Sequence, residues 1–459
     1  MSALAGCATY HAAPLANGPD LANGLEQLAT EVPAGPGRPP YQINVTRPLT
    51  IDEIGLLAML NDPELKVEFG TMDEARAELV QAELLPNPVA SISYGAIVSG
   101  GGAASIAGSL AESFAAILTH SATVKSAEAR FHEVDAEQAW REWQVAQKAR
   151  QIALDVSSAD VSIALAEREQ RMMANEVSAV RRAMSEGGTS MEDLSPLAKA
   201  TAIVDQTVMK LRLEQLKSWQ ALDGLLGLDS NVRFAIAPPR LGPVPGHIEP
   251  LMAAMPDRRP DLAALRLAYG SADEDVWAAI LGQFPGLTVG GSYNSDTTGA
   301  ITAGPNFNFA LPIFDRNQGQ VGKAVATREQ VWAKYQASLD DSVATVHGLI
   351  AQIHQLSGDL ARTSRAAADA RTLAATAHQA YSRSDLDQRT LTDYETAALE
   401  RDLDVVAIHR QIDEDKIYLA VELGLGLPEM RIALNPSIPP YTQTSATFAL
   451  WPHFGGASQ

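Results

Sequence analysis

The stretch MSEGGTSMEDLSPL (residues 184–197) joins two long segments of helical character, and YSRSDLDQRTLTDY (residues 381–394) occupies the same place 197 residues later. Each stretch opens a segment that closes on a Leu-Gly pair, at Gly227 in the first half and at Gly424 in the second. Within the two stretches Leu194 corresponds to Leu391. Self-similarity at a fixed offset indicates tandem duplication, so each half is expected to be one structural unit.

The upstream parts of the two halves also match. Asp62-Pro63-Glu64-Leu65 corresponds to Arg259-Pro260-Asp261-Leu262 at the same offset, and Leu85-Pro86 corresponds to Phe284-Pro285 with a shift of two residues. The repeat therefore predicts four parts of the chain. These are a lipobox-like segment and extended arm (1–48), a first repeat (49–245), a second repeat (246–427) and an extended C-terminal tail (428–459).

Composition favours long helices over compact domains, because 46% of the residues are hydrophobic and only 6% are aromatic. The 55 acidic and 35 basic residues give a net charge of -20, which argues against binding nucleic acid, where affinity comes from neutralising phosphates. No apolar run reaches the roughly 18 residues that a transmembrane helix needs. A membrane role would therefore have to use strands.

Four segments change to the period of strands, in residues 89–99, 105–118, 287–297 and 301–313. The clearest alternation places Phe307, Phe309 and Leu311 on one face and Asn306 with Asn308 on the other. Alternating segments of about ten residues are typical of a transmembrane β-barrel. Soluble hairpins are the alternative. A carboxylate fits poorly in lipid, so the second strand is expected to leave the membrane before Glu112.

Two very long helical hairpins are expected beyond the strand pairs, because no proline interrupts residues 90–195 or 313–427. A helix over residues 321–381 would be about 90 Å long at about 1.5 Å per residue. Gly187, Gly188 and Ser384 are expected to form the turns at the hairpin tips. Pro312 is expected to mark the bend between strand and helix.

The single cysteine, Cys7, follows Leu4-Ala5-Gly6, which resembles the lipobox at which bacterial lipoproteins are cleaved and acylated. Six preceding residues are too few for a complete signal peptide. Lipidation at Cys7 is the preferred interpretation, and a chance match is the alternative.

The order strand hairpin, helical hairpin, strand hairpin, helical hairpin resembles the outer-membrane factor family. These are the TolC-like channels of tripartite efflux and type I secretion, here closest to the efflux lipoprotein branch. The sequence motifs that carry this resemblance most specifically are Arg258-Arg259-Pro260-Asp261-Leu262, Phe284-Pro285 and Leu311-Pro312-Ile313-Phe314-Asp315. The resemblance implies an α+β fold in which each subunit gives four strands. A homotrimer closes the β-barrel in the bacterial outer membrane, and an α-helical tunnel continues it into the periplasm.

The resemblance also implies a function, that of an efflux exit duct that passively conducts small molecules or metal cations. Its expected partners are a periplasmic adaptor protein, an inner-membrane pump and outer-membrane lipid. In the family, acidic residues after the second tip constrict the aperture and attract cations. Carried onto this sequence, these positions fall on Asp393 and Thr390, with Asp193 as the first-half equivalent of Thr390. Asp385 and Asp387 lie near the same tip. For each Asp, a helix cap or a solvated tip residue is the alternative.

Sequence motifs of catalysis are absent, including a phosphate-binding loop, a nucleophile elbow and a zinc-protease signature. The chain is therefore not expected to be an enzyme or to hold a cofactor. His347 and His354 share a helix face but are too far apart to hold one ion alone, so no metal site is expected. The alternative function is a periplasmic coiled-coil scaffold without a channel. The sequence leaves the cargo open.

Overall fold

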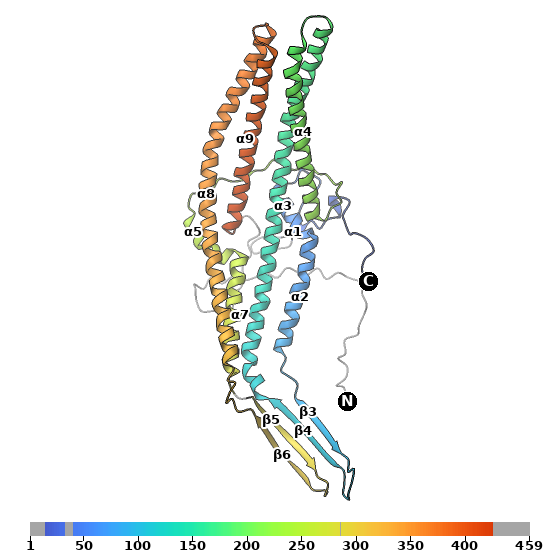
Figure 1. Ribbon diagram of the computed structural model, residues 1–459. Helices are drawn as coiled ribbons and strands as arrows, with labels where there is room; N and C mark the ends of the chain where they lie inside the picture. Colours follow the sequence, from blue (N-terminus) through green and yellow to red (C-terminus); the bar gives the residue numbers. More distant parts are fainter. Residues whose placement is uncertain (1–13, 33–39, 285, 426–459) are drawn as a thin grey trace.

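The computed structural model describes residues 14–32, 40–284 and 286–425. It is an elongated molecule with a four-stranded sheet at one end and the tips of two helical hairpins at the other (Figure 1). Cys7 and the predicted tail, residues 428–459, lie outside the described residues, as do residues 33–39 of the predicted arm.

The sheet is antiparallel throughout, and its strand order is β3-β4-β5-β6. Its two central strands, β4 and β5, come from different halves of the chain and pair along most of their length. The strands are Val89–Gly95 (β3), Ser105–Ser113 (β4), Leu287–Ser295 (β5) and Ile301–Phe309 (β6).

The strands are shorter than the sequence pattern predicts. β4 ends at Ser113 instead of continuing to residue 118, because the Ser113 hydroxyl accepts a hydrogen bond from the Ala116 backbone N–H at 3.4 Å and caps a helix there. β6 ends at Phe309, so Leu311 does not share the strand face predicted for it. Pro312, which lacks an N–H to pair, follows within three residues.

The register separates the sheet into an apolar and a polar face. Ile92 pairs with Gly108, Gly108 with Tyr293, and Tyr293 with Ala303, so these positions lie on one face. The other face carries small polar residues, and the hydroxyls of Ser91 and Ser109 are 2.7 Å apart on it. The apolar face continues with exposed large residues on all four strands, namely Tyr94, Ile106, Leu110, Val289, Ile301, Phe307 and Phe309.

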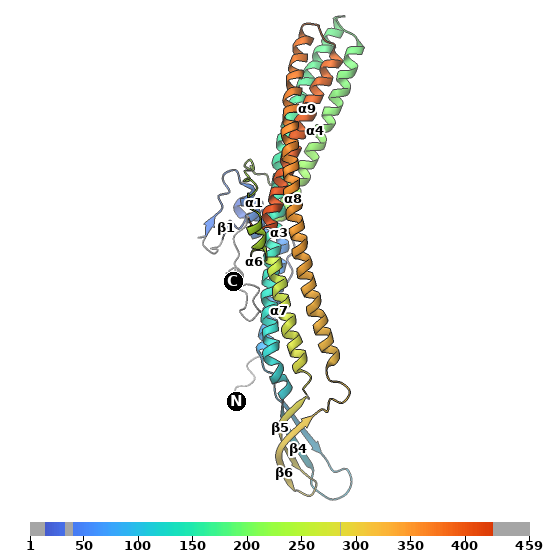
Figure 2. The same cartoon turned by 90° about the vertical axis from the view of Figure 1, so that its left-hand side faces the viewer.

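Four long helices form the rest of the rod. The first hairpin consists of Phe114–Ser185 (α3, 72 residues) and Met191–Leu226 (α4). The second consists of Gln318–Ser382 (α8, 65 residues) and Gln388–Glu422 (α9). At about 1.5 Å per residue, α3 is about 108 Å long and α8 about 98 Å. The hairpins lie side by side, and α9 contacts both α3 and α4 (Figures 1 and 2).

Shorter helices complete the lower half of the rod, where α3 and α8 have no α4 or α9 beside them (Figure 1). Pro63–Glu83 (α2) packs on α3, and Pro260–Leu281 (α7) packs between α3 and α8. The remaining elements are Leu25–Gln27 (η1), Glu31–Val32 (β1), Tyr41–Gln42 (β2), Ile51–Asn61 (α1), Glu249–Ala253 (α5) and Met255–Arg258 (α6).

Local chemistry explains where α1 and α2 begin. The Thr50 hydroxyl accepts from the Glu53 N–H at 3.2 Å, and the Glu53 carboxylate accepts from the Thr50 N–H at 3.0 Å, which is a capping box. Asp62 caps α2 by accepting from the N–H groups of Glu64 and Leu65, with Pro63 at the first helical position. Residues that are adjacent in the sequence therefore set both helix starts.

Arg259 joins four helices at mid-height and is 4% exposed. Its guanidinium makes a bidentate pair with Asp261, at 3.0 and 2.7 Å, and a second ion pair with Glu422 on α9. It also donates to the Ser342 hydroxyl on α8 at 2.9 Å and lies 5.1 Å from the ring centroid of Trp140 on α3. A planar guanidinium satisfies several partners at once, which explains an arginine at this crossing.

None of the described helices combines the length and the apolar character that crossing a membrane requires.

Candidate functional site at the helical tips

The two tip turns have the same backbone geometry. Gly188 donates its N–H to the Ala183 carbonyl at 2.8 Å, and 197 residues later Asp385 donates to Ala380 at 2.9 Å. Gly187 has a φ of 76° and Ser384 a φ of 62°, so both adopt the left-handed conformation that ends a helix. Gly tolerates this conformation freely, whereas Ser384 adopts it at a cost.

Two of the candidate aperture acids act as helix caps. Asp193 accepts from the Thr189 hydroxyl at 2.5 Å and completes a capping box with Ser190. Asp387 accepts from both the N–H and the hydroxyl of Thr390, each at 2.8 Å, and these bonds hold its pKa below the ordinary value. Thr390 is therefore a partner of Asp387. A helix-capping role thus accounts for the hydrogen bonds that the carboxylates of Asp193 and Asp387 accept.

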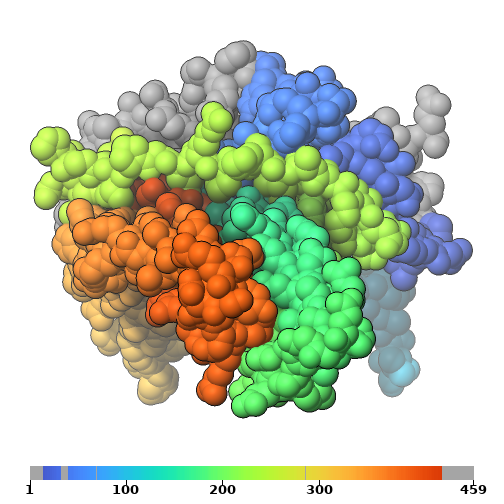
Figure 3. Space-filling model, turned by 90° about the horizontal axis from the view of Figure 1, so that it is seen from above, coloured from blue at the N-terminus to red at the C-terminus, as the bar shows by residue number. Residues whose placement is uncertain are grey.

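The other two candidate acids are exposed. Asp385 lies 3.5 Å from Arg383, so its charge is partly balanced within the turn. Asp393 lies on the second turn of α9, and among the described residues its carboxylate makes no hydrogen bond or ion pair. Asp393 is thus the candidate whose charge is least engaged by its own chain. Viewed from the tips, the two hairpin ends lie beside each other (Figure 3).

A group of buried and half-buried acids, which no sequence pattern signals, lies between the hairpins below the tips. Glu176 on α3 and Glu395 on α9 lie close together, and Glu169 on α3 lies near both. Burial raises the pKa of Glu169 to about 7. Burial and then the charges of Glu176 and Glu169 raise that of Glu395 to about 8. Glu176 and Glu395 are separated by more than two hundred positions, so no spacing in the sequence signals the group.

Pro312, predicted to mark the junction, lies three residues after β6 and six before α8. Glu112 lies on β4 opposite Val289, near the helical end of the apolar face. Strand β4 therefore passes into α3 directly, whereas residues 310–317 connect β6 to α8.

The sequence of the second half of the chain matches a known protein family. Residues 253–424 match the model of the outer membrane efflux protein family. These residues form an outer membrane efflux protein domain. The resemblance seen in the sequence is confirmed, and so is the expected location at the level of the family, which is one of outer-membrane channels.

Solved structures of outer-membrane proteins, two of them described as channels, share the fold along most of the chain. The CmeC channel of Campylobacter jejuni is 15% identical with a TM-score of 0.70, and the match covers 83% of this chain and 86% of CmeC. VceC of Vibrio cholerae is 15% identical with a TM-score of 0.69, covering 82% and 96%. MtrE of Neisseria gonorrhoeae, in its open state, is 15% identical with a TM-score of 0.68, covering 83% and 90%. None of the curated proteins matches the chain in sequence.

These likenesses show the fold, and the α+β class with long helices and antiparallel strands is confirmed. Closure of the barrel, the trimer and the twofold repeat stay predictions. The same holds for the four-part division of the chain and the roles predicted for the aperture residues, Cys7 and Pro312.

Proposed function

We propose that this chain is one subunit of a trimeric outer-membrane duct, through which an efflux system releases its cargo. The observation that carries the proposal is the four-stranded sheet, because one of its faces is apolar and exposed while the other is lined by small polar residues. Such a sheet suits lipid on one side and water on the other.

Trimer formation follows from the edges of the sheet. Within the described part of the chain, β3 and β6 each pair on one side only. Open edges are not tolerated in hydrocarbon, because unpaired N–H and C=O groups find no water there. Closing the sheet with copies of itself satisfies both edges, and three copies, as in the family that the sequence resembles, give a closed barrel.

The long helices would continue the barrel into the periplasm, where the tips would meet an adaptor protein and an inner-membrane pump. Transport through such a duct is passive, and the family matched is one of channels rather than enzymes. The net charge of -20 favours cationic cargo, drugs or metal ions, over anions. Selection itself would take place at the pump.

Asp393 is the residue we propose for the aperture. It is exposed near the tip, and its carboxylate is not engaged by its own chain in the way that Asp193 and Asp387 are. Three copies around an axis would form a ring of negative charge that favours cations and disfavours anions.

Planar-bilayer recording on the purified full chain tests the proposal. The wild type should form stable, cation-selective pores, and Asp393→Asn should lower the cation-to-anion permeability ratio severalfold. Asp73→Asn is the matched control, since it makes the same charge change at an exposed position of α2, far from the tips. Absence of pores in the wild type would refute the duct and favour the periplasmic scaffold. Equal selectivity in the two variants would refute the role of Asp393 alone.

A further inference from the structure

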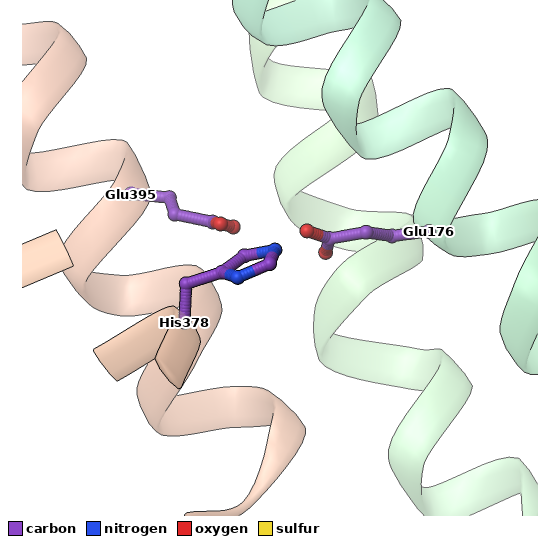
Figure 4. A group of neighbouring side chains, drawn as sticks. All are labelled: Glu176, His378 and Glu395. Carbon is purple, nitrogen blue, oxygen red and sulfur yellow. The ribbon is translucent and has the colours of Figure 1, made fainter. Parts of the chain in front are cut away.

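Three helices bring metal-binding side chains to one point between the two hairpins. Glu176 extends from α3, His378 from α8 and Glu395 from α9. One ligand atom from each side chain lies within 4.8 Å of the other two. Figure 4 shows both carboxyl groups turned toward the imidazole ring from opposite sides.

The most buried member of this group has an unused oxygen. Glu395 is 4% exposed, and its Oε2 has no hydrogen-bond partner among the described residues. A buried carboxyl oxygen without a partner is costly, and native structures nearly always satisfy such an atom with a protein group, water or an ion. Glu395 is aimed at the other two side chains, so a ligand that they share would also satisfy Glu395.

A neighbouring amide orients the second carboxylate. Gln388 is 2% exposed and donates through Nε2 to Glu176 Oε2 at 3.2 Å. The Glu176 carboxyl also faces that of Glu395, with which it shares a hydrogen bond when one of the two carries a proton. Such outer contacts typically fix the direction of metal ligands. The cluster thus consists of three candidate metal ligands, and a hydrogen bond from Gln388 orients one of them, Glu176.

We propose that Glu176, His378 and Glu395 bind a divalent transition-metal ion of the Zn²⁺ class, which bridges the two helical hairpins. One imidazole and two carboxylates suit Zn²⁺, and three protein ligands leave a fourth position for water. Donors in a tetrahedral zinc site lie about 3.4 Å apart, given bonds of about 2.0 to 2.2 Å. The donor atoms, which lie within 4.8 Å of one another, therefore need to approach by up to about 1.4 Å, which side-chain rotation supplies because His378 is exposed.

The imidazole ligand sets the selectivity. Mg²⁺ and Ca²⁺ prefer oxygen ligands alone and six or more of them, so a three-donor site with a nitrogen disfavours both. His347 and His354 lie nearer the N-terminal end of α8 than His378 does. Among the described residues they belong to no group of three metal-binding side chains.

A bound ion would cross-link the two hairpins, because its ligands come from α3 of the first hairpin and from both helices of the second. Any movement that separates the hairpins would have to break a metal–ligand bond. Where the tips gate a duct, which rests on the function proposed above, the ion would hold the aperture in the arrangement seen here.

Isothermal titration of ZnCl₂ into the full chain, purified in detergent with a tag that lacks histidine, tests the site directly. The expected result is one Zn²⁺ per chain, with an affinity that falls at least tenfold in His378→Ala and in Glu395→Gln. His354→Ala removes an exposed histidine from the same helix and should leave the affinity unchanged. A wild type without binding heat would overturn the site, as would variants that bind like the wild type.

Thermal unfolding of the same samples tests the bridge and checks the fold of the variants. Zn²⁺ should raise the unfolding midpoint of the wild type and of His354→Ala, because a ligand that binds only the folded state stabilises it. His378→Ala should start from a similar midpoint and show no rise. A midpoint that Zn²⁺ leaves unchanged in the wild type would overturn the bridge. Neither measurement depends on conductance, so failure of the metal site and failure of the duct are separate results.

Discussion

Replacing Glu142 with glutamine should remove the contribution of one buried carboxyl to the dependence of stability on pH. Glu142 lies on α3 and is 7% exposed. Its Oε1 accepts from Gln138 at 3.3 Å, while its Oε2 has no partner among the described residues. Burial, with a smaller contribution from the charge of Asp135, raises its pKa from 4.5 to about 7. This carboxyl therefore keeps its proton in the folded chain at pH values where the unfolded chain has lost it.

The sign and size of the effect follow from this raised pKa. The folded state binds more protons than the unfolded state between the two pKa values, so the free energy of unfolding falls as pH rises through this window and levels off above pH 7. At about 1.4 kcal/mol per pKa unit, the full loss is about 3 kcal/mol, of which about 2.5 kcal/mol falls between about pH 5 and pH 8.5. Glu142→Gln cannot ionise and should lack this loss.

Urea unfolding of the detergent-purified protein, followed by tryptophan fluorescence, measures the difference. The stability of Glu142→Gln relative to the wild type should rise by about 2.5 kcal/mol between about pH 5 and pH 8.5. Other buried acids, such as Glu133 with its pKa of about 7, are common to both proteins and cancel. Glu400→Gln, an exposed exchange on α9, is the control. A difference that stays flat with pH would refute the reasoning about Glu142.

Three further predictions concern Arg259, the sheet and the helical tips. Arg259→Met should lower stability by about 3 to 5 kcal/mol, because Asp261 and Glu422 lose their buried partner, and a change below about 1 kcal/mol in urea unfolding would contradict this. Ile92→Arg on the apolar face should reduce the assembled outer-membrane protein, at a cost of about 2 to 4 kcal/mol, while the neighbouring Ser93→Arg on the polar face should assemble normally. Gly187→Ala should destabilise by about 1 to 2 kcal/mol through its positive φ, whereas replacing Ser384 with glycine should not, and the two melting midpoints decide.

Local patterns in the sequence predicted much of the fold. The four strands and the turns at Gly187 and Ser384 depend on residues that are close in sequence, so their signals are visible there. The strand ends were less accurate, because Ser113 caps a helix where apolar alternation alone continues.

The contacts between helices could not be predicted. The positions of Asp193 and Asp387 are consistent with helix caps, but only the structure shows which hydroxyl and N–H groups they accept from. Glu176, His378 and Glu395 come from three helices, and their meeting depends on how the hairpins pack. Single residues of this kind carry no periodic signal, so a sequence read without relatives does not reveal them.

The central claim is that copies of this chain close a barrel in the outer membrane. Its most direct test is to express the full chain with export to the periplasm, extract the membranes with alkaline carbonate and run the outer-membrane fraction on an unheated gel. A closed barrel should resist extraction and migrate as a trimer until it is heated. Release by carbonate as a monomer would contradict barrel closure.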